Sequence, residues 1–111
     1  MKIDKEKIIR ANRTFGGNLY NPSNLDFDVE MANKQKNPFK SLAHVTRSMT
    51  SGHAFSDANK RTAGVVIKSE LYNRGIKLDN KRLSRLMVNL AEKKESRINI
   101  IERKLRRVIR K

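Results

Sequence analysis

Apolar residues recur at three- and four-residue steps along most of the chain, the periodicity of helices that bury one face. The clearest case is 39–51, where Phe39, Leu42, Thr46 and Met49 share a face and Gly52 is placed to end the helix. Comparable stripes predict four further helices. The first helix would follow a cap at Asp4, carry Ile8 and Ile9, and end near Gly16-Gly17. The other three would bury, in order, Ala63, Val66, Ile67 and Leu71 before a stop at Gly75; Leu83, Leu86, Met87 and Leu90 after a start at Asp79-Asn80; and Ile98, Ile101, Leu105 and Val108.

The region between the first two of these helices is less regular. Residues 18–24 read as a loop because of their Asn-Pro and Ser-Asn steps, and 33–38 read as a polar connector. Residues 25–31 alternate apolar and acidic side chains, which is typical of a strand, yet Leu25 and Val29 also fit one helix face. The pattern does not decide between strand and helix for these residues. The predicted fold is all-α, a compact bundle of five or six helices forming a single domain over 1–111.

The most distinctive feature of the composition is its excess of basic residues. Twenty-six Lys and Arg stand against eleven acids, a formal net charge of +15. Such a surplus attracts polyanions, so nucleic acid, acidic protein surfaces, membranes and nucleotide phosphates are all candidates, beside a merely solvated surface. Seven of the cations fall in 97–111, with one Glu. Against a nucleic-acid-binding protein stand the scarcity of aromatic stacking residues and the lack of a helix-turn-helix or zinc pattern.

The residue content argues against several classes of protein: those held by disulfides or thiolate metal sites, membrane-spanning proteins and secreted proteins. The chain has no cysteine, so neither disulfides nor thiolate metal sites are available. No apolar run approaches the ~18 residues of a membrane span. The N-terminal stretch is too charged for a signal peptide. We therefore expect a cytoplasmic protein with no membrane partner.

The candidate chemistry gathers in GHAFSDANKRTA, between two predicted helices. It places His53, Asp57, Asn59, Lys60 and Arg61 within nine residues. Asp57 is a plausible N-cap for the following helix, whose N–H groups and positive dipole end would form an anion site. Cations are unfavourable at that end of a helix, so two of them there suggest a bound anion, most simply phosphate.

The same motif offers a base and a metal ligand. His53, with an ordinary pKa of ~6.5, suits a general base near neutral pH. Asp57 resembles the single carboxylate that often holds Mg²⁺ beside substrate phosphates. Phe55, between them, is expected to point into the core and fix the loop. His44, the other histidine, is expected off the buried stripe and dispensable. Each residue alone could be structural, but their joint order favours phosphoryl or nucleotidyl transfer.

HAFSDANKR resembles the Fic/Doc signature, H-x-F-x-D/E-G/A-N-G/K-R, at all seven constrained positions, and the similarity extends over the whole chain. The resemblance implies a Fic/Doc-type helical fold and a transferase that modifies a protein hydroxyl with ATP and Mg²⁺. It makes His53 the base, Asp57 the metal ligand and Phe55 the anchor. A flap that holds the target by strand pairing would fall near 33–38. The phosphate and nucleotide ligands would be Ala58, Asn59, Lys60, Arg61 and Thr62.

Departures from the commonest form of the signature point to a subgroup. Ala54 replaces a proline, Ala58 and Lys60 replace glycines, and Gly64 stands in place of a second arginine. These changes argue against the usual AMP transfer and resemble the Doc, or death-on-curing, toxins. That subgroup implies a kinase that phosphorylates elongation factor Tu and is held by an antitoxin. The family's inhibitory pattern, S/T-x-x-x-E-G/N, is missing here, so an antitoxin partner is expected. AMP transfer remains the alternative reaction.

Overall fold

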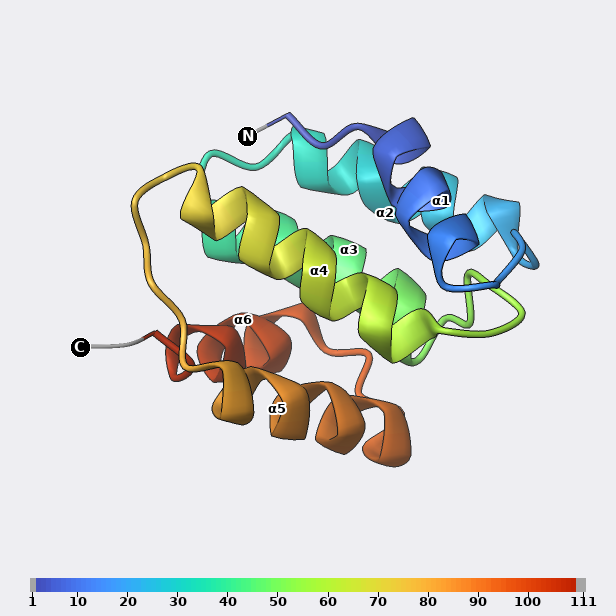
Figure 1. Cartoon of the computed structure of the whole chain (residues 1–111). Helices are drawn as coiled ribbons and strands as arrows, with labels where there is room; N and C mark the ends of the chain where they lie inside the picture. Colours follow the sequence, from blue (N-terminus) through green and yellow to red (C-terminus); the bar gives the residue numbers. More distant parts are fainter. Residues whose placement is uncertain (1, 110–111) are drawn as a thin grey trace.

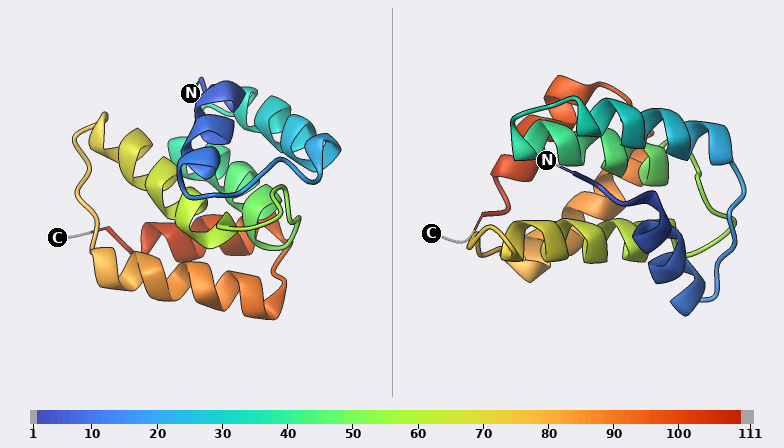
Figure 2. Two further views of the ribbon diagram at one scale, coloured as in Figure 1. Left: turned by 45° about the vertical axis from the view of Figure 1, so that its right-hand side comes forward. Right: turned by 90° about the horizontal axis from the view of Figure 1, so that it is seen from above.

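The computed structural model of this protein describes residues 2–109, and within them the chain is all-α, as predicted (Figure 1). Three layers of two helices stack on one another: α1 with α2, α3 with α4, and α5 with α6 (Figure 2). No helix in this part of the chain has both the length and the apolarity to cross a membrane. The helices are α1 Lys5–Thr14, α2 Pro22–Asn33, α3 Pro38–Thr50, α4 Asn59–Tyr72, α5 Asn80–Lys93 and α6 Ile98–Arg106.

Residues 25–31 belong to a helix, which settles the segment left open by its pattern. Asn21 caps α2 and Pro22 occupies its first turn, so the predicted loop 18–24 is three residues too long. Leu25 and Val29 are buried, while Phe27, one of the alternating apolar residues, is 56% exposed. Burial therefore follows the helical period, and the alternation was misleading because one apolar residue of α2 faces solvent.

α3 is the centre of the molecule. It packs against α2, α4, α5 and α6, and ten of its thirteen residues are buried. His44 is among them, only 5% exposed, so the expectation that it lies off the buried face is wrong. A helix covered on several sides has no solvent face for the pattern to reveal. At its outer edge Arg47 forms a 2.6 Å ion pair with the buried carboxylate of Asp28 on α2.

The C-terminal layer closes back onto the start of α5. Asp79 caps α5, as predicted, and its backbone N–H donates to the carbonyl of Val108. The basic residues of α6 are partly engaged within the fold: Lys104 donates to Asn89, and the Arg106 guanidinium lies 4.7 Å from the centre of the Phe39 ring. Arg110 and Lys111, which also belong to the basic segment 97–111, lie outside the described residues.

The turn into α6 is fixed by one carboxylate. The side chain of Glu95 is 8% exposed and accepts hydrogen bonds from the Arg97 guanidinium at 2.9 Å and from the Arg97 backbone N–H at 3.1 Å. These bonds, the side-chain ones first, lower the pKa of Glu95 from its ordinary 4.5 to about 2. Because the folded-state pKa is depressed, the contribution to stability is present above pH 4.5 and disappears as pH falls towards 2.

We therefore predict that Glu95→Gln lowers the free energy of unfolding near neutral pH but has little effect near pH 2. Urea unfolding of wild type and variant across this range measures the difference. Glu92→Gln is the matched control, since Glu92 is an exposed acid of α5 with no ion pair in the described structure. A Glu95→Gln effect that stayed constant down to pH 2 would contradict the assignment.

Candidate functional site

The motif loop, residues 51–58, leaves the end of α3 and turns back into α4 (Figure 1). The N–H of Gly52 donates to the carbonyl of Arg47, which ends α3 at the predicted place. The N–H of Ala54 then donates to the carbonyl of Ser48. The loop is thus folded against the last turn of α3 before it reaches the motif's polar residues.

Two non-glycine residues of this loop have left-handed backbones. His53 has φ 47° and Ala58 has φ 60°. Each such residue costs about 1–2 kcal/mol, so neighbouring contacts must hold the conformation. Phe55 provides some of these contacts: as expected, its ring is buried, with 1% of the residue exposed. Asn59 contributes as well, because its side-chain oxygen accepts from the N–H of Phe55 at 3.0 Å and its amide nitrogen donates to the Phe55 carbonyl at 2.8 Å.

The segment between α1 and α2 pairs with the motif loop. The N–H groups of Tyr20 and Asn21 both donate to the carbonyl of Ala54, and the N–H of Ser56 donates to the carbonyl of Asn18. Leu19 and Phe55 thereby form an isolated antiparallel bridge. This pairing joins the first helical layer to the motif.

The expected flap at 33–38 is wrong. Residues 34–37 are the connection between α2 and α3, and they lie at the end of α3 opposite the motif loop (Figure 1). Thirteen helical residues span about 20 Å, which puts that connection out of reach. The upstream segment beside the motif is 18–21, which polar composition alone did not distinguish from other connectors.

Asn12 is a further residue of the site that the sequence pattern missed. It lies on α1, is 1% exposed, and its amide donates to the carbonyl of Asp57 at 2.8 Å and to the hydroxyl of Thr62 at 3.1 Å. A side chain at Gly17 would collide with both the Asn12 amide and the Asp57 carbonyl, so glycine is required there. A polar residue at a buried position of the predicted first helix was the available signal.

The N-terminus of α4 is open. Ala58 is the residue before its first turn, and no side chain in the described part of the chain caps it. The prediction that Asp57 is the N-cap is therefore wrong: its carboxylate accepts from the neighbouring N–H of Ala58 at 2.7 Å and not from the first turn of α4. The left-handed turn at Ala58 separates Asp57 from the helix. The first-turn N–H groups thus remain available to an anion.

Two cations accompany these N–H groups. Lys60 is exposed, and no described residue forms an ion pair or hydrogen bond with it. Arg61 is also exposed, and its guanidinium lies 5.2 Å from the centre of the Phe15 ring. Such a cation–π contact orients an arginine without neutralising it. Positive charge at the positive end of a helix dipole is unfavourable unless an anion binds.

Two of the expected phosphate ligands, Asn59 and Thr62, have side chains that form hydrogen bonds within the motif. The hydroxyl of Thr62 is buried and donates to the carbonyl of Ala58 at 2.8 Å, and its backbone N–H donates to the same carbonyl. The side-chain amide of Asn59 is occupied by Phe55. Both side chains hold the loop and the start of α4 in place. The first-turn N–H groups and the side chains of Lys60 and Arg61 remain to bind an anion.

His53 and Asp57 are exposed on the same loop. No cluster of three or more His, Cys, Asp or Glu side chains able to hold a metal occurs in residues 2–109. The donor set nevertheless fits Mg²⁺, which commonly binds through one carboxylate and completes its coordination with substrate phosphates and water. Asp57, with one oxygen on Ala58, has its second oxygen without a described partner.

Comparison with known proteins agrees with this geometry. The model of the Fic/DOC family matches residues 3–71, more than half of the chain. The chain belongs to the Fic/DOC family. Members of this family are generally nucleotidyl or phosphoryl transferases that use ATP and Mg²⁺. Searches of curated proteins and of solved structures each found no match.

The family match is shorter than the resemblance suggested. It includes α1 to α4 and the motif, and it ends at Leu71, the second-last residue of α4. The two helices of the third layer, α5 and α6, lie beyond it. The match therefore includes the motif and the four helices that hold it.

We predict that Asn12→Ala destabilises the protein by about 1–3 kcal/mol and weakens ATP binding, because the Asp57 carbonyl loses its buried donor. Calorimetric titration with ATP and urea unfolding measure the two effects. Asn33→Ala is the matched control, since Asn33 also bonds across the sequence, to Ile3, but far from the motif. The control should lose stability and keep ATP affinity; equal loss of affinity in both variants would rule out a local role for Asn12.

Proposed function

We propose that this protein is a kinase that transfers the γ-phosphate of ATP to a hydroxyl group of a target protein. The observation that supports it most is the open N-terminus of α4, with Lys60 and Arg61 exposed on its first turn, directly after exposed His53 and Asp57. An uncapped helix end with two cations fits a polyphosphate. A base and a carboxylate beside it are the remaining parts of phosphoryl transfer.

Each residue has a defined part in the reaction. His53 accepts the proton of the acceptor hydroxyl, whose oxygen attacks the γ-phosphorus while the bond to the β-phosphate oxygen breaks and ADP leaves. Asp57 holds Mg²⁺, which when bound supplies positive charge to the phosphates. The α4 N–H groups, Lys60 and Arg61 bind and orient those phosphates.

The assignment to γ-phosphate transfer rests on positions 60 and 64. Lys60 puts a flexible ammonium where AMP-transferring members of the family have glycine, and Gly64 lacks their second arginine. Lys60 has no partner among the described residues, so its charge is free to hold a phosphate. Both features resemble the Doc subgroup.

The 18–21 segment is the proposed docking edge for the target. Its inner side pairs with Ala54 and Ser56, whereas the N–H and C=O of Leu19 have no described hydrogen-bond partner. Tyr20 beside it is 72% exposed. An extended acceptor peptide could add to this edge by strand pairing, with Tyr20 as an apolar contact. The target class expected from the resemblance is a translation factor, elongation factor Tu.

The net charge of +15 supports a partner with an acidic surface, and an antitoxin is the partner we propose. A cavity of about 460 Å³ between α5 and α6 is lined by Arg82, Arg85, Lys104 and Arg107 around Leu86 and Val108. Its charge would also suit nucleic acid, which is the second candidate function. Apolar side chains on its floor favour an amphipathic acidic peptide over a phosphate backbone.

Incubation with a cell lysate and ATP labelled at either the γ- or the α-phosphate tests the reaction. We predict that only γ-label is transferred and that the mass of the modified target rises by one phosphate. Lys60→Gly should lose this activity, because the retained phosphates lose a ligand. Lys60→Gly combined with Gly64→Arg is the fuller test for a gain of AMP transfer. An added AMP from the wild type would overturn the kinase and favour the adenylyltransferase.

We also predict that His53→Ala abolishes transfer while unfolding stability and ATP affinity change little, since His53 is exposed at a loop edge. His44→Ala is the contrasting variant. His44 is buried on α3, where burial and nearby Arg47 lower its pKa, so its removal should reduce stability and leave transfer per folded molecule intact. Wild-type rates in His53→Ala would refute its role as the base.

A further inference from the structure

An aromatic side chain at the C-terminal end of α1 contacts a cation on the first turn of α4. Phe15 is half-buried at the residue that follows α1, and the guanidinium of Arg61 lies 5.2 Å from the centre of its ring. Two cation–π contacts occur among the described residues, and the other joins Arg106 to Phe39 at the opposite end of α3 from the motif. Most cations of the described chain have no aromatic partner, so the contact at the motif is not a general feature of the basic surface.

The backbone around Phe15 is fixed by hydrogen bonds. The carbonyl of Asn12 accepts from the N–H of Phe15 at 3.0 Å and from the N–H of Gly17 at 3.1 Å. The side-chain amide of Asn12 donates to the carbonyl of Asp57 at 2.8 Å. The turn that carries the Phe15 ring is therefore bonded to the loop that leads into α4, and the ring has a defined place beside the first turn of that helix.

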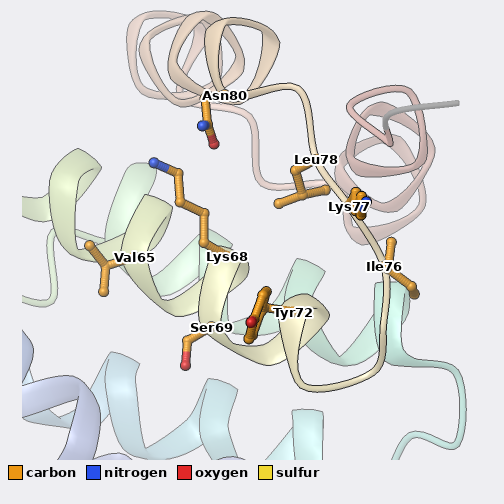
Figure 3. A pocket seen from close by; sticks show the side chains of 8 residues that line it. All are labelled: Val65, Lys68, Ser69, Tyr72, Ile76, Lys77, Leu78 and Asn80. Atoms are coloured by element: carbon orange, nitrogen blue, oxygen red, sulfur yellow. The ribbon is translucent and has the colours of Figure 1, made fainter.

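Farther along α4, a cation and an aromatic residue lie on one face of the helix and do not pair. Lys68 and Tyr72 are four residues apart, a separation that puts two side chains on the same face of a helix. In Figure 3 the side chain of Lys68 extends towards Asn80 and not over the ring of Tyr72, which is 80% exposed. Closeness along a helix is thus not enough to produce the contact, whereas the Phe15 ring is brought to Arg61 by the packing of α1 on α4.

From these contacts we infer that Phe15 is a positioning residue, which orients the Arg61 guanidinium for the phosphates of the proposed function, on which the inference rests. An arginine stacks on a ring through its flat face, so the N–H groups at its edge stay free to donate to phosphate oxygens. No described residue forms an ion pair or a side-chain hydrogen bond with Arg61. The ring therefore restricts the guanidinium without competing for its donors.

Restricting Arg61 before a ligand arrives strengthens binding. An arginine side chain has several rotatable bonds and loses their freedom when a ligand immobilises it. Because Phe15 already restricts the guanidinium, part of that loss occurs on folding and not on binding. Lys60, the neighbouring cation, has no described partner. The first turn of α4 thus combines one oriented, fork-shaped donor with one flexible point charge.

Phe15→Leu and Phe15→Tyr provide the direct test. Leucine keeps an apolar side chain but removes the ring, whereas tyrosine keeps the ring. Affinities for inorganic triphosphate and for ATP, each with Mg²⁺, are measured by calorimetry, and urea unfolding confirms that each variant is folded. We expect Phe15→Leu to weaken both affinities about three- to tenfold and Phe15→Tyr to bind like the wild type.

Two further aromatic residues serve as controls. Tyr72→Leu removes an exposed ring from the other end of α4, and Phe39→Leu removes the ring of the second cation–π contact. Because Phe39 is buried, its replacement should lower stability. Both variants should keep the triphosphate affinity of the wild type, and a loss in either one equal to that in Phe15→Leu would contradict a specific role for Phe15.

A double-mutant cycle with Arg61→Gln separates positioning from a merely structural role. Without the guanidinium there is nothing for the ring to orient, so adding Phe15→Leu to Arg61→Gln should change triphosphate affinity by less than about twofold. An equal effect of Phe15→Leu with and without Arg61 would show that the ring acts through the general fold, and the inference would then be wrong.

The outcomes separate this role from the proposed reaction. Unchanged triphosphate affinity in Phe15→Leu would overturn the positioning role even if the wild type transfers γ-phosphate. A loss of affinity that depends on Arg61, with no transfer by the wild type, would support the positioning role and overturn the kinase. Failure of the wild type to bind either compound would overturn both.

Discussion

The pair of hydrogen bonds between the Asn59 side chain and the backbone of Phe55 is the interaction on which the site depends. The amide spans the turn and fixes residues 55–59 as a closed loop. Because the Asn59 side chain is committed to the loop, and the Asp57 carboxylate accepts from the N–H of Ala58 and not from the first turn, neither side chain caps α4. The same contacts that hold the loop therefore leave a helix N-terminus open to an anion.

The open helix end is accompanied by several features that are unfavourable for folding, and all of them lie in a short stretch of the chain. Two left-handed non-glycine residues, an uncapped helix end and two cations at the positive end of a dipole all occur between His53 and Arg61. The core offsets them: Phe55 is fully buried, Asn12 reaches across from α1, and the 18–21 segment pairs along the loop. Strain that surrounding structure must hold in place is common at functional sites, where it fixes the geometry in advance.

Acidic and basic side chains are distributed differently over the structure. The few acids with low exposure are paired within the fold, as in Asp28 with Arg47 and Glu95 with Arg97. Most cations have no such partner available, since twenty-six face only eleven acids. The surplus is exposed at the motif, along α4 and over the α5–α6 face, where it attracts anionic ligands and acidic surfaces and makes their binding sensitive to salt.

The sequence by itself determined the helices with one solvent face and the order of groups in the motif. Asp4, Asp79, Gly52 and Gly75 mark helix ends through local backbone chemistry, and the spacing from His53 to Arg61 is local as well. What it could not determine depends on contacts far apart in the chain. Residues 25–31 are helical although their pattern alternates, because exposed Phe27 adds an apolar residue on the solvent side of α2. His44 is buried because α3 is covered on several sides, which leaves it no solvent face for a periodic pattern to show. Asn12 reaches the motif, 18–21 and not 33–38 lies beside it, and the Phe15 ring contacts Arg61, because tertiary packing alone sets which distant segments meet.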